Sequence, residues 1–167
     1  MHKIRRHKLS KDYVKSAVFG IEDSLVSTTG LIAGVAVASS DKKFVIIAGL
    51  IAIAVEAVSM AAGEFISEET EVDLEKGNDK ANPIKSGAIM FVAYFLSGLI
   101  PIIPIILFPL PQSVYISVAA ALVGLFILGV IKGRITKRGL VRSGMTVLVV
   151  GGVATAIGIA VGVIFRI

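Results

Sequence analysis

Five apolar stretches, each close to the length of a membrane-spanning helix, leave this sequence few ways to fold. They cover residues 16–39, 44–66, 84–108, 114–131 and 143–165. About 20 apolar residues in a helix cross roughly 30 Å of hydrocarbon. With 55% of its 167 residues hydrophobic and 17% charged, the chain also has too little polar surface to cover a soluble globule of this size. The sequence therefore predicts an all-α, polytopic membrane protein, a single domain of five transmembrane helices.

The segments between these stretches are short and charged. Residues 1–15 form a basic arm, and residues 67–83 form an acidic linker. No Gly or Pro separates the second stretch from the acidic residues after it, so we expect the second helix to project beyond the membrane and stop near Gly77. Pro101 and Pro104 each remove a helical hydrogen bond from the third stretch. That helix should therefore be kinked, or broken and shielded by its neighbours.

The basic residues predict which side of the membrane each loop faces, because they gather on the cytoplasmic side of short loops. Fourteen of the 17 Lys and Arg residues lie in the arm, after the second helix, or between the fourth and fifth helices. The opposite face keeps Lys42, Lys43 and Arg166. We expect a cytoplasmic N-terminus and an external C-terminus. This sorting and the attraction of anionic lipid account for the net charge of +5, so nucleic-acid binding is not expected.

Carboxylates at membrane depth are the main indication of function, because a charge in hydrocarbon is costly unless it is paired, hydrated or neutralised. Glu56, Met60 and Glu64 recur at spacings of four residues, which places them on one helix face, about 6 Å apart along the axis. Glu71 continues this stripe, and Asp23 lies about two turns into the first helix. Carboxylate oxygens bind hard or borderline cations, and a thioether favours transition metals such as Fe²⁺ over Mg²⁺ and Ca²⁺. The pattern predicts cation transport.

Most of these residues also have a purely structural interpretation. Met60 lies among small residues and suits a packing role. Glu64 suits the membrane surface, where solvation requires no function. The acidic run in residues 68–79 is typical of a solvated helix surface, although its place beside the stripe also suits a cation-collecting mouth. Glu56, near the centre of its span, is the hardest to explain in this way.

The residue types argue against an enzyme. There is no cysteine, which excludes disulfides, thiolate metal ligands and cysteine nucleophiles. The sequence has no nucleophile and base constellation and no phosphate-binding loop, and no soluble domain fits beside the five spans. We therefore expect no catalytic residues and no cofactor.

Three parts of the chain resemble a known family. Residues 19–30, Phe-Gly-Ile-Glu-Asp-Ser-Leu-Val-Ser-Thr-Thr-Gly, resemble the first-helix signature of the vacuolar iron transporter family, with Ser24 where Gly is usual. Residues 57–67, Ala-Val-Ser-Met-Ala-Ala-Gly-Glu-Phe-Ile-Ser, resemble its second-helix signature around Ser-Met and Gly-Glu-Tyr. Residues 133–154 are similar to its last loop and helix. The chain is identified as a member of that family over almost its whole length.

The resemblance implies a homodimer of five-helix protomers with a pore between the two copies. The pore would carry Fe²⁺ or Mn²⁺ out of the cytoplasm in exchange for protons. On this resemblance Asp23 and Met60 match the membrane ion site, Glu64 takes the family's Gly-Glu position, and Glu56 lies one turn further into the membrane.

Some family members carry a long Glu-rich insertion between the second and third helices. Here the corresponding segment, residues 67–85, is too short for such a domain, although Glu68, Glu69 and Glu71 match its first turn. The resemblance therefore implies a short member that suits a prokaryotic cytoplasmic membrane.

Two rival hypotheses remain. One is a structural or assembly membrane protein whose acidic stripe pairs with a partner's basic helix. The other is a passive divalent cation channel, which would conduct without dependence on a proton gradient.

Overall fold

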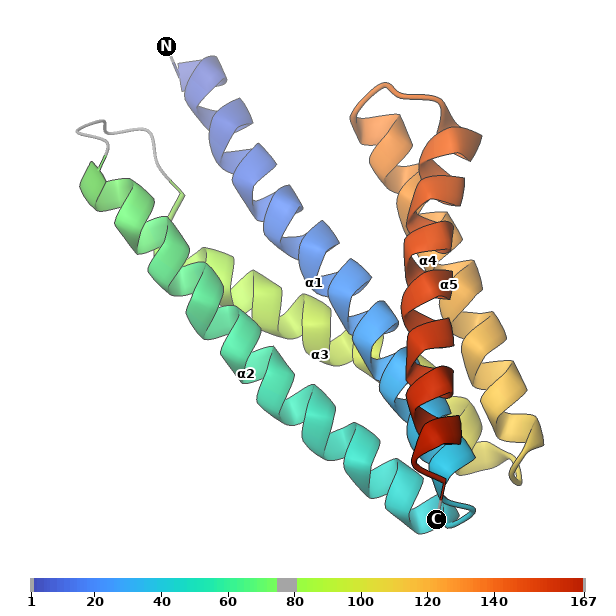
Figure 1. Ribbon diagram of the computed structural model, residues 1–167. Coiled ribbons are helices and arrows are strands. Elements are labelled where there is room, and N and C mark those ends of the chain that lie inside the picture. Colours follow the sequence, from blue (N-terminus) through green and yellow to red (C-terminus); the bar gives the residue numbers. More distant parts are fainter. Residues whose placement is uncertain (1, 75–80, 167) are drawn as a thin grey trace.

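The computed structural model describes residues 2–74 and 81–166, with side chains from residue 11 onward. Five α-helices follow one another along the chain, and each is long and apolar enough to cross a membrane. This confirms the predicted all-α fold with five transmembrane helices. The two ends of the chain lie at opposite ends of the bundle (Figure 1). The helices are α1 (His2–Ala38), α2 (Lys42–Leu74), α3 (Pro83–Leu107), α4 (Gln112–Ile135) and α5 (Leu140–Ile164).

The helix bounds depart most from the predicted spans in α1 and α2, and α4 also runs four residues past its predicted end, to Ile135. α1 begins at His2, so the basic arm of residues 1–15 is largely a continuation of the first helix. α2 runs on to Leu74, which confirms that it projects past its apolar stretch and makes the first half of the predicted linker helical. The predicted end of this helix near Gly77 lies outside the described residues.

Short polar residues set two of the helix starts. The Asp41 carboxylate accepts a hydrogen bond of 2.8 Å from the backbone N–H of Lys43 and so caps α2. Asn82 caps α3 by accepting from the backbone N–H of Lys85 at 3.1 Å, and Pro83 occupies the first helical turn. α2 and α3 therefore begin where the sequence supplies a side-chain oxygen for their unpaired amides.

α3 passes through both of its internal prolines without interruption. Pro101 and Pro104 are buried, and the hydroxyl of Ser117 on α4 donates to the carbonyl of Pro101 at 2.6 Å. Neighbouring helices therefore cover this stretch, as a proline-containing helix in a membrane requires.

α1 lies in the middle of the bundle, between α2 on one side and the α4–α5 pair on the other (Figure 1). α1 packs against all four other helices, whereas α2 packs only against α1 and α3 among the described parts of the chain. The outer faces of the peripheral helices are apolar and exposed; on α2, Val55 and Val58 are 63% and 60% exposed. Such faces suit contact with lipid acyl chains.

α1 and α5 approach so closely that their backbones touch. A Cβ atom added at Gly158 would lie 2.2 Å from the carbonyl oxygen of Gly30, and one added at Gly162 would lie 2.1 Å from that of Gly34. Only glycine allows this distance, which is the usual way in which small residues bring membrane helices together.

Candidate functional site

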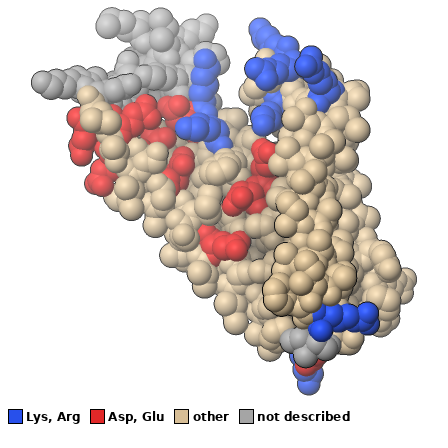
Figure 2. All heavy atoms as spheres, viewed as in Figure 1, with Lys and Arg blue, Asp and Glu red and all other residues tan. Residues whose placement is uncertain are grey.

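Most of the acidic side chains of the membrane stretch lie on the side of α1 that faces α2. Figure 2 shows them as a diagonal band that descends from the acidic end of α2 toward the middle of the bundle. This band follows the line along which α1, α2 and α3 meet. The predicted residues therefore lie beside a helix junction, on a face of the bundle where acidic side chains reach the surface (Figure 2).

Glu56 is the deepest of the predicted residues and is held by two hydroxyl groups. Ser27 of α1 donates to its carboxylate at 3.1 Å, and the phenol of Tyr94 on α3 donates to the same oxygen. The two hydroxyl groups are also 2.6 Å apart. Glu56 lies about 20 Å along α2 from the start of that helix, near the middle of a span. A half-buried carboxylate at this depth is thus solvated by the protein itself.

Asp23 and Met60 lie next to this network. Asp23 on α1 is half-buried and close enough to Glu56 and Glu22 for their like charges to repel. Met60 follows Glu56 by one turn on α2 and is also half-buried. A cation placed between these groups would relieve the repulsion and meet carboxylate oxygens and a thioether sulfur.

Glu64 has a partner of its own nearer the end of the bundle. The Ser16 hydroxyl of α1 donates to Glu64 at 2.5 Å. The structure thus repeats one arrangement at two depths, a serine of α1 bonded to a glutamate of α2. A hydroxyl group is an uncharged partner. It leaves the carboxylate able to bind a metal ion or a proton, because it brings no positive charge that would compete.

Glu68 and Glu71 lie beyond this level, where α2 leaves its apolar stretch. Glu68 is only 8% exposed and lies near Glu64, Glu71 and Asp12, with Lys15 also close. Glu71 is exposed. The predicted stripe therefore extends from Glu56 to Glu71, but its members differ in burial.

The six predicted residues do not form one compact cluster. Among the residues that the structure describes, no three His, Asp or Glu side chains are grouped closely enough to hold a metal ion. The structure instead brings Asp23 and Glu56 together, and leaves Glu64, Glu68 and Glu71 spread along the outer part of α2.

Two residues of the network were not singled out from the sequence. Tyr94 stands in an apolar segment and looks like a packing residue, yet it is fully buried and its hydroxyl reaches Glu56. Ser16 lies at the start of the first predicted span. The sequence does contain an indication for Tyr94, because a phenol at membrane depth needs a hydrogen-bond partner.

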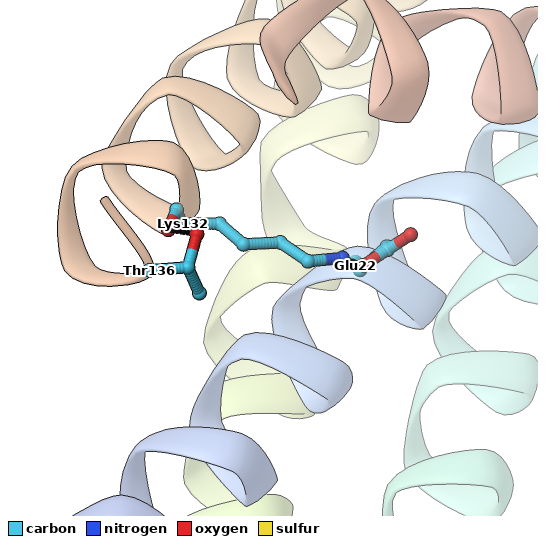
Figure 3. A network of polar contacts seen from close by, with 3 residues as sticks. All are labelled: Glu22, Lys132 and Thr136. Atoms are coloured by element: carbon cyan, nitrogen blue, oxygen red, sulfur yellow. Dashed lines mark hydrogen bonds and ion pairs between the residues drawn. The ribbon is translucent and has the colours of Figure 1, made fainter. Parts of the chain in front are cut away.

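Glu22 faces away from this network toward α4. Lys132 of α4 reaches across to it, with 3.7 Å between the ammonium nitrogen and a carboxylate oxygen (Figure 3). The neighbouring residues Glu22 and Asp23 therefore have different surroundings. Glu22 is paired with a cation, whereas Asp23 is repelled by other carboxylates.

Comparison with known proteins covers nearly the whole chain. The sequence model of the VIT family matches residues 14–81 and 75–163. A protein named vacuolar iron transporter homolog 2, from Oryza sativa subsp. japonica, is 30% identical, with 89% of this chain and 88% of the relative covered. Vacuolar iron transporter homolog 3 of Arabidopsis thaliana is also 30% identical, with 87% and 79% covered.

A longer relative is similar as well. Vacuolar iron transporter 1 of Oryza sativa subsp. japonica is 24% identical in an alignment of 217 residues that covers 93% of this chain. Because that alignment is longer than the chain itself, the relative contains residues without a counterpart here. This agrees with the expectation of a short member.

Proposed function

Because this chain belongs to the VIT family, we propose that it transports divalent transition-metal ions, Fe²⁺ and also Mn²⁺, across a membrane in exchange for protons. Members of the family are transporters rather than enzymes. The observation that carries the proposal is Glu56, a carboxylate in mid-membrane bonded only to hydroxyl groups among the described residues.

The residues around Glu56 supply a suitable ligand set. Glu56 and Asp23 offer hard carboxylate oxygens, and Met60 offers a softer sulfur that disfavours Mg²⁺ and Ca²⁺. The hydroxyl groups of Ser27 and Tyr94 orient the Glu56 carboxylate, as outer-shell partners do in metal sites.

The same carboxylates support the proposed exchange for protons. A metal ion binds the deprotonated group, so proton binding and metal binding compete. The repulsion between Asp23 and Glu56 favours occupancy by one or the other cation over an empty, fully charged pair. A divalent ion neutralises both carboxylates, so return of a proton to each of them would keep the pair neutral after the metal ion has left.

We further propose that two copies of the chain complete the site. Asp23, Glu56 and Met60 give three side-chain donors, while first-row transition ions commonly take four to six. A two-fold axis beside α2 would double this set, and among the described parts of the chain α2 packs only against α1 and α3, which leaves much of its surface open to a second copy.

The distribution of charge supports the proposed direction of transport. The basic residues at the start of α1 and between α4 and α5 support a cytoplasmic location for that end of the bundle. The acidic end of α2, with Glu64, Glu68 and Glu71, lies at the same end and would collect cations there (Figure 2). Export from the cytoplasm, in a prokaryotic cytoplasmic membrane, is the proposed role.

Transport into proteoliposomes tests this function. We expect Fe²⁺ and Mn²⁺ uptake that depends on an imposed pH gradient and falls in Met60→Leu, which keeps the side-chain volume but removes the sulfur. The control is Met145→Leu, an exposed methionine on α5. Metal uptake that does not depend on the pH gradient would indicate a channel, and the absence of any metal uptake would contradict transport.

A further inference from the structure

A basic pocket lies at the end of the α4–α5 hairpin, apart from the carboxylate network. Its volume is about 680 Å³, within the range of roughly 300–1,000 Å³ typical of ligand sites. Figure 2 shows basic side chains gathered around this end of the molecule. The polar residues that line the pocket are Lys132, Thr136, Arg138, Arg142, Ser143 and Thr146.

The turn between the two helices fixes the position of the cations. Lys137 has a left-handed φ of 56°, and the backbone N–H of Arg138 donates to the carbonyl of Gly133 at 2.9 Å. This is the hydrogen bond of a Schellman turn, which reverses the chain sharply at a helix end. It holds Arg138 over the end of α4 and brings it to the same pocket as Arg142 of α5.

The pocket offers donors that the protein leaves unused. Among the described side chains, Arg138 and Arg142 have no carboxylate partner, and the Ser143 hydroxyl makes no hydrogen bond. Gly139 occupies the N-cap position of α5 and provides no side-chain cap, so the first amides of α5 also point toward this end unpaired by any side chain. Guanidinium groups, a hydroxyl and the start of a helix together match a phosphate group.

We propose that this pocket binds the phosphate of an anionic phospholipid. It lies at the end of two spanning helices, which is the level of lipid headgroups in a bilayer. Val141, Met145 and Val149 of α5 are exposed and continue from the pocket along the helix, where the acyl chains of such a lipid would lie. The concave arrangement distinguishes this site from basic residues that only set orientation.

Lys132 connects the pocket to α1. Its ammonium group reaches Glu22 while its side chain also lines the pocket (Figure 3). A bound phosphate competes with Glu22 for this cation, so lipid binding alters the charge balance next to Asp23. The site thereby provides a route by which lipid composition acts on the α1 carboxylates.

Thermal unfolding in neutral detergent tests lipid binding without reference to transport. The probes are dioctanoyl phosphatidylglycerol, dioctanoyl phosphatidylcholine and inorganic phosphate at equal concentration and ionic strength. We expect phosphatidylglycerol alone to raise the unfolding midpoint, by about 5 °C near saturation. The Arg138→Gln/Arg142→Gln variant should lose this rise.

The matched control is Lys11→Gln/Lys85→Gln, which removes two exposed charges outside the pocket and should keep the full rise. Arg138→Gln alone, with a smaller rise expected, serves if the double variant does not fold. An equal rise in the pocket variants, or no rise in the wild type, would overturn the proposal. An equal rise with inorganic phosphate would overturn the assignment to a lipid.

Discussion

The two sides of α1 contact their neighbouring helices in different ways, one through close backbone packing and the other through hydrogen bonds. Toward α5, glycines bring backbones into contact and no side-chain hydrogen bond is recorded between the two described helices. Toward α2 and α3, Ser16 and Ser27 bond to glutamates, and the Tyr94 phenol completes the network. One side is packed so closely that a Cβ atom at Gly158 or Gly162 would clash with the facing backbone, and the other has the polar groups that we propose bind an exchangeable cation. On this account we expect stability and transport to depend on different faces of one helix.

The largest effect is expected from Glu56→Gln, which keeps the size of the side chain but removes its charge. Loss of a ligand should exceed the roughly 10–100-fold cost of losing an outer-shell partner, so we expect Fe²⁺ transport to fall by more than about 100-fold. Unfolding temperature should change little. The control, Asp41→Asn, removes a carboxylate at the opposite end and retains an oxygen that caps α2. Normal transport by Glu56→Gln would show that the hydrogen-bond network around Glu56 takes no part in transport.

Gly158→Ala should affect the opposite side of α1, and it should lower stability rather than transport. Its Cβ atom would meet the backbone of Gly30, so we expect destabilisation by about 2 kcal/mol from overpacking. Gly152→Ala on the same helix is the control, because nothing lies within 4 Å of its Cβ position. Thermal unfolding of the purified proteins checks this difference, and equal stability of the two variants would contradict the close α1–α5 contact.

Tyr94→Phe tests whether the network positions Glu56. Removal of the phenol oxygen leaves Glu56 with Ser27 as its hydroxyl donor, and we expect metal affinity to fall by about tenfold. Tyr115→Phe, at a tyrosine that is 74% exposed on α4, should behave as wild type. Equilibrium binding of Mn²⁺ gives the metal affinity of both variants. Unchanged affinity in Tyr94→Phe would show that the Tyr94 phenol serves only in packing.

Ser16→Ala should give the smallest effect. Ser16 is buried, but its partner Glu64 is partly exposed and so can be solvated by water when the hydroxyl is lost. The expected cost is therefore about 0.5–1 kcal/mol, or a few-fold in transport rate. The exposed Ser40→Ala serves as control. An effect as large as that of Glu56→Gln would show that the two depths of the site are equally important.

Most of the fold could be predicted from the sequence because each span carries its own signal. Hydrophobic length identified five helices, and the absence of a Gly or Pro break after residue 66 indicated that α2 continues, as it does to Leu74. The continuity of α3 through Pro101 and Pro104 could not be decided in advance, because it depends on the helices packed around it.

The candidate site was only partly predictable. Spacing along one helix placed Glu56, Met60 and Glu64 on one face, since that requires only helical geometry. Which residues of other helices face them depends on tertiary packing, so Tyr94 and Ser16 emerged only from the structure. The contrast between Glu22 and Asp23 also required the position of Lys132.

The most direct test of the account follows protons and metal together. Proteoliposomes containing a pH-sensitive dye would receive an inward Fe²⁺ gradient with no imposed pH gradient. The account predicts that the lumen becomes more alkaline as Fe²⁺ enters, and that both signals disappear in Glu56→Gln but persist in Asp41→Asn. Fe²⁺ influx without a change in luminal pH, or an unchanged response in Glu56→Gln, would contradict it.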